Sequence, residues 1–184
     1  MRIEEITANK RRFLPLLLIG DEQESMIDRY LTAGRLFALY DGEGGGEISA
    51  CGSARSEPAH TNAGSKTDST ASAACGEPGL RAAAVLTNRG GGAYELNNLS
   101  VDPAFHRQGY GRAMLDHLAA LARAEGGARL IAATGESPLT LPFYAACGFT
   151  AFGREPGYFP RHYSHPIVEG GVLLCDLIWL ERKL

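Results

Sequence analysis

The sequence predicts a single domain of the α/β class. Its 184 residues are enough for one well-packed core and too few for two. Strand-like and helix-like patterns alternate along the chain, from a short strand at Met1–Thr7 to an apolar strand at Val172–Leu180. Hydrophobic residues make up 45% and charged residues 21%, which is the balance of an ordinary globular protein. We therefore expect one domain over residues 1–184.

The first half of the chain contains two predicted strands with helical segments between them. Met1–Thr7 alternates apolar and polar residues at its start, which is typical of a strand. Two helical stretches follow, and the clearer one has apolar residues at helical spacing between 26 and 31 and ends at Gly34. Arg35–Tyr40 is predicted to be the next strand, and it ends at the glycine-rich turn 41–46.

A low-complexity segment divides the chain. Ser56–Gly79 is rich in Ser, Thr, Ala and Gly, so it buries too little apolar surface to offset the entropy of ordering it. We expect a flexible surface insertion there. The sheet is predicted to resume at Arg81–Thr87, and Asn88–Gly92 is predicted to turn a hairpin.

The second half predicts strands and helices in alternation. Tyr94–Val101 is a strand, Gly111–Glu125 is a helix with one apolar face, and Leu130–Thr134 is a short apolar strand. Ser137-Pro138 has the pattern of an N-cap followed by proline at the first helical position, and this helix should end near Gly148. Val172–Leu180 is apolar except at Asp176, as expected of a strand covered on both faces, and Asp176 should be satisfied by an internal hydrogen bond.

Charge and cysteine content argue against several classes of protein. The net charge of −3 gives no basic excess, so neither nucleic-acid nor membrane binding is expected. The apolar run Phe13–Ile19 is interrupted by Pro15 and is far shorter than the ~20 residues that span a bilayer. The 4 cysteines show no C-x-x-C spacing, so we expect no disulfide framework, no metal site and a cytoplasmic location.

The connection between the strand ending at Val101 and the following helix has the character of a phosphate cradle. Backbone amides at a helix start are unpaired and lie at the positive end of the helix dipole, which favours an anion. Gly109 and Gly111 carry no side chain to block those amides, and Arg107 and Arg112 can add charge-assisted contacts.

Two glycines one residue apart are weak evidence by themselves, because a tight strand-to-helix connection has the same pattern. A Rossmann fingerprint is disfavoured because Met114 occupies the place of its third glycine. A P-loop is disfavoured because no lysine and Ser/Thr pair follows Gly111.

Five segments together resemble the GNAT acetyltransferases, whose motif A is similar to Glu95–Pro103 with the cradle and Arg112–Leu115. Segments similar to Thr134–Ser137, Phe143–Phe149 and Arg161–Tyr163 recur in this order in a bacterial GNAT subgroup of unassigned substrate. The resemblance extends from about Gly92 to the C-terminus. The first ninety residues match only in the order of their elements.

The resemblance implies a GNAT-like fold: a mixed sheet of six or seven strands, flanked by about four helices and splayed into a V between the strand ending at Val101 and the one around Ile131. It implies acetyl-CoA as cosubstrate, with the pantetheine arm in the V and the pyrophosphate on the cradle. The cofactor-binding residues that it implies are Leu99, Ser100, Val101, Arg107, Gln108, Gly109, Tyr110, Gly111, Arg112 and Ser137.

Two residues are candidates for the chemistry. Glu95 is the candidate base because the early part of its strand faces the acceptor in the family; the alternative is a carboxylate in solvent or a salt bridge. Tyr144 matches a family tyrosine whose hydroxyl lies near the cofactor sulfur; the alternative is a core aromatic. The chain departs from the family pattern at His106, at Ala132, where some members have a glutamate, and at Ser137, which a helix cap explains more simply.

The function predicted from this resemblance is transfer of acetyl from acetyl-CoA to a primary amine of a small molecule or protein, by direct attack through a tetrahedral intermediate. The alternative is a non-catalytic acyl-CoA-binding module, in which the cradle persists without an acceptor site. Glu95 and Tyr144 favour the enzyme, and the missing glutamate at Ala132 keeps the module open. The sequence does not identify the acceptor amine, and a homodimer stays open.

Overall fold

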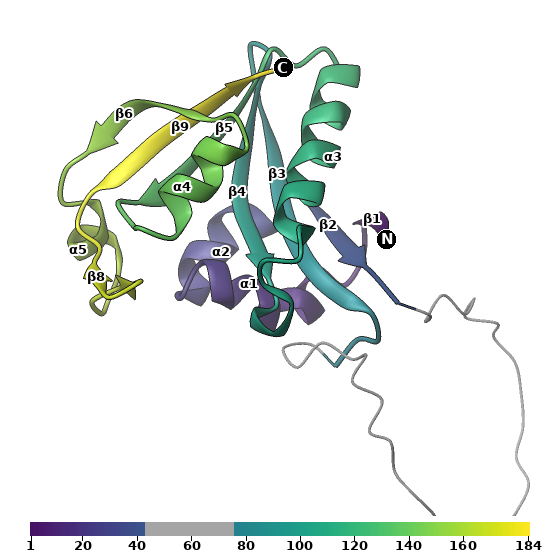
Figure 1. The fold of residues 1–184 in the computed structure, drawn as a ribbon, viewed down its shortest axis with the longest axis horizontal. Helices are drawn as coiled ribbons and strands as arrows, with labels where there is room; N and C mark the ends of the chain where they lie inside the picture. The colour runs from purple at the N-terminus through teal and green to yellow at the C-terminus, as the bar shows by residue number, and fades with distance from the viewer. Residues whose placement is uncertain (43–75) are drawn as a thin grey trace, which may run out of the picture.

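A computed structural model describes residues 1–42 and 76–184, and its centre is a mixed seven-stranded sheet with the order β1-β2-β3-β4-β5-β9-β6 (Figure 1). Most of the expected insertion at 56–79 lies outside the described residues. The strands of this sheet are β1 (Arg2–Ile6), β2 (Arg35–Tyr40), β3 (Leu80–Gly90), β4 (Ala93–Val101), β5 (Arg129–Gly135), β6 (Thr150–Glu155) and β9 (Leu177–Lys183). A separate hairpin pairs β7 (Val168–Glu169) with β8 (Val172–Leu173).

Helices cover both faces of the sheet. The described residues contain five α-helices where about four were expected: α1 (Leu14–Gly20), α2 (Glu24–Leu31), α3 (Tyr110–Ala124), α4 (Thr140–Ala146) and α5 (Tyr158–His162). Two short 3-10 turns, η1 (Lys10–Phe13) and η2 (Pro103–Phe105), precede α1 and α3. The predicted arrangement, a mixed sheet flanked by helices, is thus confirmed.

The sheet is splayed between β4 and β5, as predicted. These two strands pair in parallel over Ala93–Leu96 and Arg129–Ala132, with α3 as the crossover. Beyond Leu96 and Ala132 the register between them ends. β4 continues to Val101 paired only with β3, and β5 continues to Gly135 paired only with β9. Figure 1 shows the two strands diverging from the end of the molecule at which the C-terminus lies.

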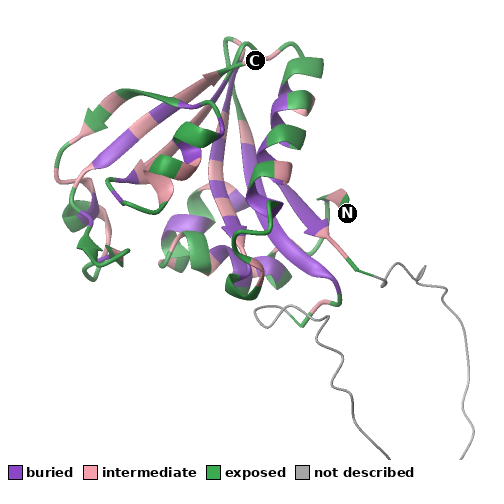
Figure 2. Ribbon diagram, viewed as in Figure 1, coloured by how far each residue is buried: buried purple, intermediate pink, exposed green. Residues whose placement is uncertain are grey.

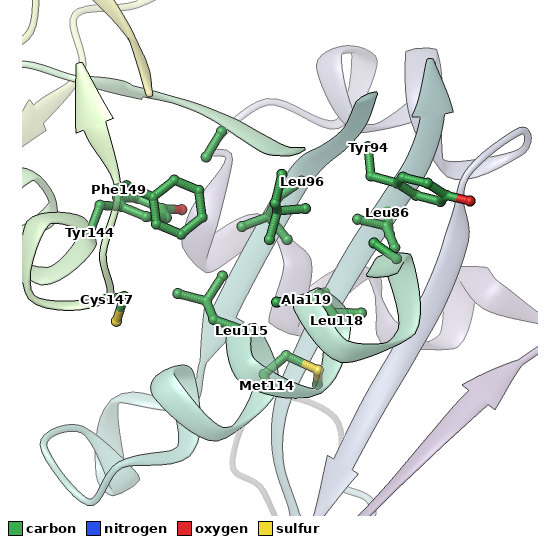
Figure 3. Close-up of a cluster of buried hydrophobic side chains, with 14 of the residues drawn as sticks. Leu86, Tyr94, Leu96, Met114, Leu115, Leu118, Ala119, Tyr144, Cys147 and Phe149 are labelled. Carbon is green, nitrogen blue, oxygen red and sulfur yellow. The ribbon is translucent and has the colours of Figure 1, made fainter. Parts of the chain in front are cut away.

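Strand alternation sends neighbouring residues of β2, β3 and β4 to opposite faces, because successive side chains in a strand point in opposite directions. On one face, Leu86, Tyr94 and Leu96 pack in a continuous core with Met114, Leu115 and Leu118 of α3 and with Tyr144 of α4 (Figure 3). Figure 2 shows that the residues of β3 and β4 are mostly buried, while β6 at the sheet edge is largely exposed. One core therefore holds α3 and α4 on the same side of the V.

The opposite face carries two separate apolar clusters. Under α1 and α2, a cluster centred on Leu17 and Ile27 packs against residues of β2 and β3 such as Leu36 and Val85. Under α5, Phe159 packs in a second cluster with residues of β9 and the chain that follows α5. The V lies between these clusters, so this face has a gap in its apolar packing at the place where β4 and β5 separate.

Three sequence predictions differ from the structure. The strand expected over Val172–Leu180 is two strands, β8 and β9, because Asp176 accepts hydrogen bonds from Gly157 N–H (2.8 Å) and the Arg154 guanidinium (2.7 Å) and breaks the run. Its first residues are exposed rather than covered, with Leu173 at 62%. Strand β6 was missed because its residues are mostly exposed and show no apolar alternation. The helix expected from Ser137 begins at Thr140.

We predict that Leu118→Ala lowers the free energy of unfolding by about 2–5 kcal/mol, because it leaves a cavity in the core under α3. Leu118 is fully buried, whereas Leu139 is 55% exposed, so Leu139→Ala is the matched control and should change stability by less than about 0.5 kcal/mol. Urea unfolding of both variants measures the difference. Equal losses would contradict the core as described.

Candidate active site

A β-bulge lies at the point where the V opens. Val85 of β3 is opposite Asn98 and Leu86 is opposite Leu96, so Asn97 is an extra residue on β4. As a result Leu96 faces the α3 core, while Asn98 points to the other face and donates to the Leu17 carbonyl at 3.0 Å. The bulge thus coincides with the end of pairing to β5, and it turns the remainder of β4 into a free edge.

Leu99, Ser100 and Val101, predicted to bind the pantetheine arm, lie on this free edge. The Ser100 hydroxyl donates to Asn98 Oδ1 at 2.8 Å, so its side chain is committed to the α1 face. The Val101 carbonyl accepts a bond from His106 Nε2 at 2.9 Å, which requires the proton on that nitrogen because a carbonyl can only accept. His106 therefore ties the end of β4 to the loop before α3.

The predicted cradle is the start of α3. Gly109 is the N-cap residue at φ 90°, and no side chain caps the first turn of this 15-residue helix. Arg107 also has a positive φ, 62°, which is uncommon outside glycine and places the loop in a tight left-handed turn. A Cβ built on Gly109 would meet nothing within 4 Å in the described ranges, so Gly109 itself faces open space.

The two glycines of the cradle have different roles. A Cβ on Gly111 would lie 3.1 Å from the Phe143 ring and 3.5 Å from Val101, so Gly111 permits close packing of α4 on the start of α3. Arg112 donates to the Ala146 carbonyl at 2.8 Å and so joins the same contact. The sequence predicted phosphate access at both glycines, and this stays a prediction; in the structure Gly109 faces open space and Gly111 packs against Phe143.

The Tyr110 side chain connects the start of α3 to the residue that follows β2. Its hydroxyl donates to Asp41 at 2.7 Å, and Asp41 also lies 3.2 Å from the N-terminal amine. The Tyr110 hydrogen bond, followed by the bond to that amine, holds the pKa of Asp41 below its usual range. The start of α3 is thereby fixed to the end of β2.

Tyr144 lies on α4 between Phe143 and Phe149, with ring centroids 5.3 Å from each. In Figure 3 its hydroxyl is on the side of the ring that faces Leu96. Among residues 1–42 and 76–184, none hydrogen-bonds to this hydroxyl. Burial raises the pKa of Tyr144, and the nearby Cys147 and Glu169 add to the rise. Tyr144 is therefore a neutral hydroxyl donor, and its proton has no acceptor among the described residues.

Ser137 precedes α4 and is buried. Its hydroxyl accepts the Leu139 N–H at 3.0 Å, and its carbonyl accepts the Leu141 N–H at 3.3 Å. The serine shapes the turn into α4, as a cap would, and its predicted contact with the cofactor stays a prediction.

Glu95 faces away from α3 and lines an open trough of about 410 Å³ on the far face of the closed end of the V. Its carboxylate pairs with Arg89 at 2.9 Å, and its side chain is 15% exposed. Apolar, aromatic and cationic side chains line the trough together with Glu95. The lining residues are Arg89, Gly90, Ala93, Glu95, Arg129, Ile131, Phe152 and Trp179. Glu95 and Tyr144 are thus on elements that border the V from opposite faces.

A polar network beside the bulge was missed by the sequence analysis. Asp21 follows α1 and accepts hydrogen bonds from Tyr163 (3.0 Å) and Tyr30 (3.2 Å), and the Tyr30 hydroxyl accepts one from Asn98 (3.1 Å). Asp21 and Tyr30 lie nine residues apart, but Asn98 and Tyr163 come from distant segments, so no local pattern brings the four residues together. Of the four residues, Tyr163 and Asn98 lie in segments that the family resemblance had singled out, Arg161–Tyr163 and Glu95–Pro103.

Comparison with known proteins agrees with this arrangement. Residues 73–151 match the model of the acetyltransferase (GNAT) domain, a span that includes β3, β4, the cradle, β5 and α4. This part of the chain is therefore similar to the GNAT acetyltransferase domain. This GNAT domain and its relatives indicate an N-acetyltransferase that depends on acetyl-CoA.

Three similar proteins match the chain from end to end. An uncharacterized N-acetyltransferase of Bacillus subtilis (strain 168), YvbK, is 22% identical over 185 residues, which cover 100% of this chain and 97% of that protein. A GNAT family acetyltransferase of Elizabethkingia anophelis, solved with acetyl-CoA, is 25% identical with a TM-score of 0.73 (100% and 97% covered). A Bacillus subtilis acetyltransferase solved with CoA has 22% identity and a TM-score of 0.74 (100% and 98% covered).

No helix in the two described ranges is long and apolar enough to cross a bilayer. Within the same ranges, no three or more His, Cys, Asp or Glu side chains gather as a metal site.

We predict that Tyr110→Phe raises the pKa of Asp41 toward its ordinary value, because the largest cause of its depression is lost. A carboxyl with a lowered folded-state pKa stabilises the fold above its unfolded pKa of about 3.9, and this stabilisation is lost as pH falls through the folded value. The variant should therefore be less stable than the wild type near neutral pH, and the difference should vanish in acid.

NMR titration of the Asp41 carboxyl and urea unfolding at several pH values measure both effects. Tyr94→Phe is the control, because the Tyr94 hydroxyl bonds to Glu125 instead. An unchanged Asp41 pKa in Tyr110→Phe would refute this anchor.

Proposed function

We propose that this protein transfers the acetyl group of acetyl-CoA to a primary amine of a small molecule or protein, by direct attack through a tetrahedral intermediate. The observation that carries the proposal is the V itself: beyond Leu96 the edge of β4 has no β5 partner among the described residues, Gly109 at the start of α3 faces open space, and the Tyr144 hydroxyl has no hydrogen-bond partner among those residues. Each is suited to a different part of the same thioester.

The cofactor-binding residues follow from the shape of the opening. Backbone groups of Leu99–Val101 suit the amides of an extended pantetheine arm, since that edge has no β5 partner among the described residues. The pyrophosphate fits the amides of Arg107–Arg112, where the dipole of α3 favours negative charge. Arg107 can add charge, whereas the Arg112 side chain already bonds to α4, so Arg112 contributes through its backbone.

Glu95 is the proposed base. An alkyl ammonium with a pKa of ~10.4 is about 3.4 units from neutrality at pH 7, so its deprotonation costs roughly 4.6 kcal/mol. The Glu95 carboxylate attracts the cationic amine to the acceptor face and accepts its proton directly or through water. Because Arg89 already pairs with Glu95, the incoming ammonium would exchange with the guanidinium, which is 59% exposed and free to move away.

Tyr144 is the proposed donor to the departing thiolate. Full proton transfer from a tyrosine at ~10 to a thiolate at ~8.5 is uphill by ~2 kcal/mol, and burial raises the pKa of Tyr144 further. A hydrogen bond that strengthens as charge develops on the sulfur is therefore the better description of its role. A buried donor with a high pKa suits this task because it stays protonated throughout the reaction.

The alternative is a module that binds acyl-CoA without transferring the acyl group. Ala132, which occupies the place of a glutamate found in some family members, is the sequence feature that keeps this alternative open. Binding of acetyl-CoA without thiol release for any amine in a broad panel would favour it.

We predict that Gly109→Asp weakens acetyl-CoA binding at least tenfold more than Gly109→Asn. Both side chains have the same size and tolerate positive φ better than most, but Asp places a negative charge beside the pyrophosphate. Two charges about 4 Å apart interact by about 1–4 kcal/mol between water and a protein surface. Asp also caps helices well, so loss of folding is not expected to explain the loss of binding.

Calorimetry with acetyl-CoA compares the two variants, and thermal unfolding checks their folding. Equal affinities would show that the pyrophosphate lies elsewhere. Gly111 is unsuitable for this test because a side chain there collides with Phe143.

We predict that Tyr144→Phe lowers turnover by roughly 10²- to 10⁴-fold and leaves acetyl-CoA affinity nearly unchanged, because it deletes only the hydroxyl. The control is Tyr94→Phe, which removes a buried tyrosine hydroxyl from the same core without touching the V. Thiol release with an accepted amine, under conditions in which chemistry limits the rate, measures the effect. Unchanged turnover would reduce Tyr144 to a packing residue.

A further inference from the structure

Asp21 is a carboxylate with an unusual set of partners. It is half-buried between α1 and α2, and its two oxygens accept hydrogen bonds from the neutral hydroxyls of Tyr30 and Tyr163. No Lys, Arg or His nitrogen in the described ranges lies within 4.0 Å of it; the exposed Arg29 acts on it only from a greater distance. Carboxylates removed from water are ordinarily paired with a cation, so this site lacks the partner that its charge requires.

The two tyrosines hold Asp21 in place without neutralising it. Burial raises the pKa of both Tyr30 and Tyr163, so each hydroxyl keeps its proton and acts as a donor. Burial also raises the pKa of Asp21, while the bonds from Tyr163 and Tyr30 act in the opposite direction. Tyr30 lies nine residues from Asp21 and Tyr163 lies 142 residues from it, so the carboxylate is tied both to α2 and to the end of α5.

Asp21 lies on the face of the sheet from which the acceptor amine is proposed to approach. Asn98, the residue after the bulge, bonds to Tyr30, so the network lies against β4 where the V opens on the face away from α3. Gln23 adds a second link across the V, because its side chain accepts the Ser164 N–H at 2.9 Å. Asp21 therefore lies in the gap between the two apolar clusters of the acceptor face.

Asp21 and Glu95 border the same region from two sides. Tyr163, which donates to Asp21, and Trp179, which lines the trough beside Glu95, pack against the same apolar cluster under α5. Tyr158 of α5 also packs against this cluster, and its ring centroid lies 4.3 Å from that of His162. An acceptor whose reacting amine approaches Glu95 thus has a second, fixed carboxylate within the same polar and aromatic region.

We propose that Asp21 binds a second cationic group of the acceptor, so that the preferred substrates are diamines or other amines with a further ammonium or guanidinium group. This inference rests on the proposed function, because Asp21 belongs to an acceptor site only if the protein acetylates an amine. One amine is placed at the thioester and is acetylated, and the other remains charged and pairs with Asp21. A carboxylate held by two hydroxyl donors retains acceptor capacity for such a cation.

Binding of amines to the CoA-loaded protein tests the proposal without requiring turnover. Calorimetry compares α,ω-diaminoalkanes of three to six carbons with the n-alkylamines of the same lengths. The best diamine should bind about 10- to 100-fold more tightly than its monoamine, which corresponds to about 1.4–2.8 kcal/mol. Asp21→Asn, which keeps size and shape, should abolish this preference and leave CoA affinity and monoamine binding unchanged.

Two further variants distinguish a direct contact between Asp21 and the second cationic group from a general effect of negative charge near the site. Glu22→Gln removes the neighbouring, 48% exposed carboxylate and should keep the diamine preference. Tyr163→Phe retains Asp21 but removes one of its donors, and it should reduce the preference less than Asp21→Asn. If Asp21→Asn does not fold, the wild-type comparison and Tyr163→Phe still decide the question.

Equal binding of diamines and monoamines by the wild type would overturn the proposal, as would a preference that survives in Asp21→Asn. Failure of the proposed function gives a different result: diamines would bind selectively, but no amine would release thiol from acetyl-CoA. A role for Asp21 that is only structural would lower thermal stability in Asp21→Asn and leave the ratio of affinities unchanged.

Discussion

The limited pairing of β4 with β5 is the constraint on which the rest of the structure depends. The two strands share hydrogen bonds from Ala93 to Leu96 and then separate. Backbone groups in a sheet are normally satisfied by the neighbouring strand, so an early end to pairing leaves polar groups available to a ligand. The bulge at Asn97 marks the same point, and it also reverses which side chains of β4 face α3.

The helical layers keep the strands apart. On one face, α3 and α4 pack together through Gly111 and Phe143 and form a continuous core across the V (Figure 3). On the other face, the clusters under α1/α2 and under α5 are separate, and polar bonds such as Tyr163 to Asp21 join them. A cofactor can thus be supported by the first face while an acceptor approaches through the polar gap in the second.

Local pattern predicted the elements that have a strong period or a clear terminator. β2 matches its predicted bounds of Arg35–Tyr40, and α3 begins within one residue of the predicted start, because apolar periodicity and flanking glycines are strong signals. β6 was missed because an exposed edge strand has little apolar alternation, and Val172–Leu180 was taken as one strand because apolar content alone does not reveal the turn at Asp176.

The sequence by itself determined the glycine-containing connection between a strand and a helix, since glycine spacing and helix periodicity are local properties of the chain. Its resemblance to the GNAT family carried the V, Glu95 and Tyr144. Only the tertiary structure decided that Gly109 faces open space while Gly111 packs on Phe143. It alone brought Asp21, Tyr30, Asn98 and Tyr163 together, because contacts over 142 residues of chain depend on how the layers pack and leave no periodic trace in the sequence.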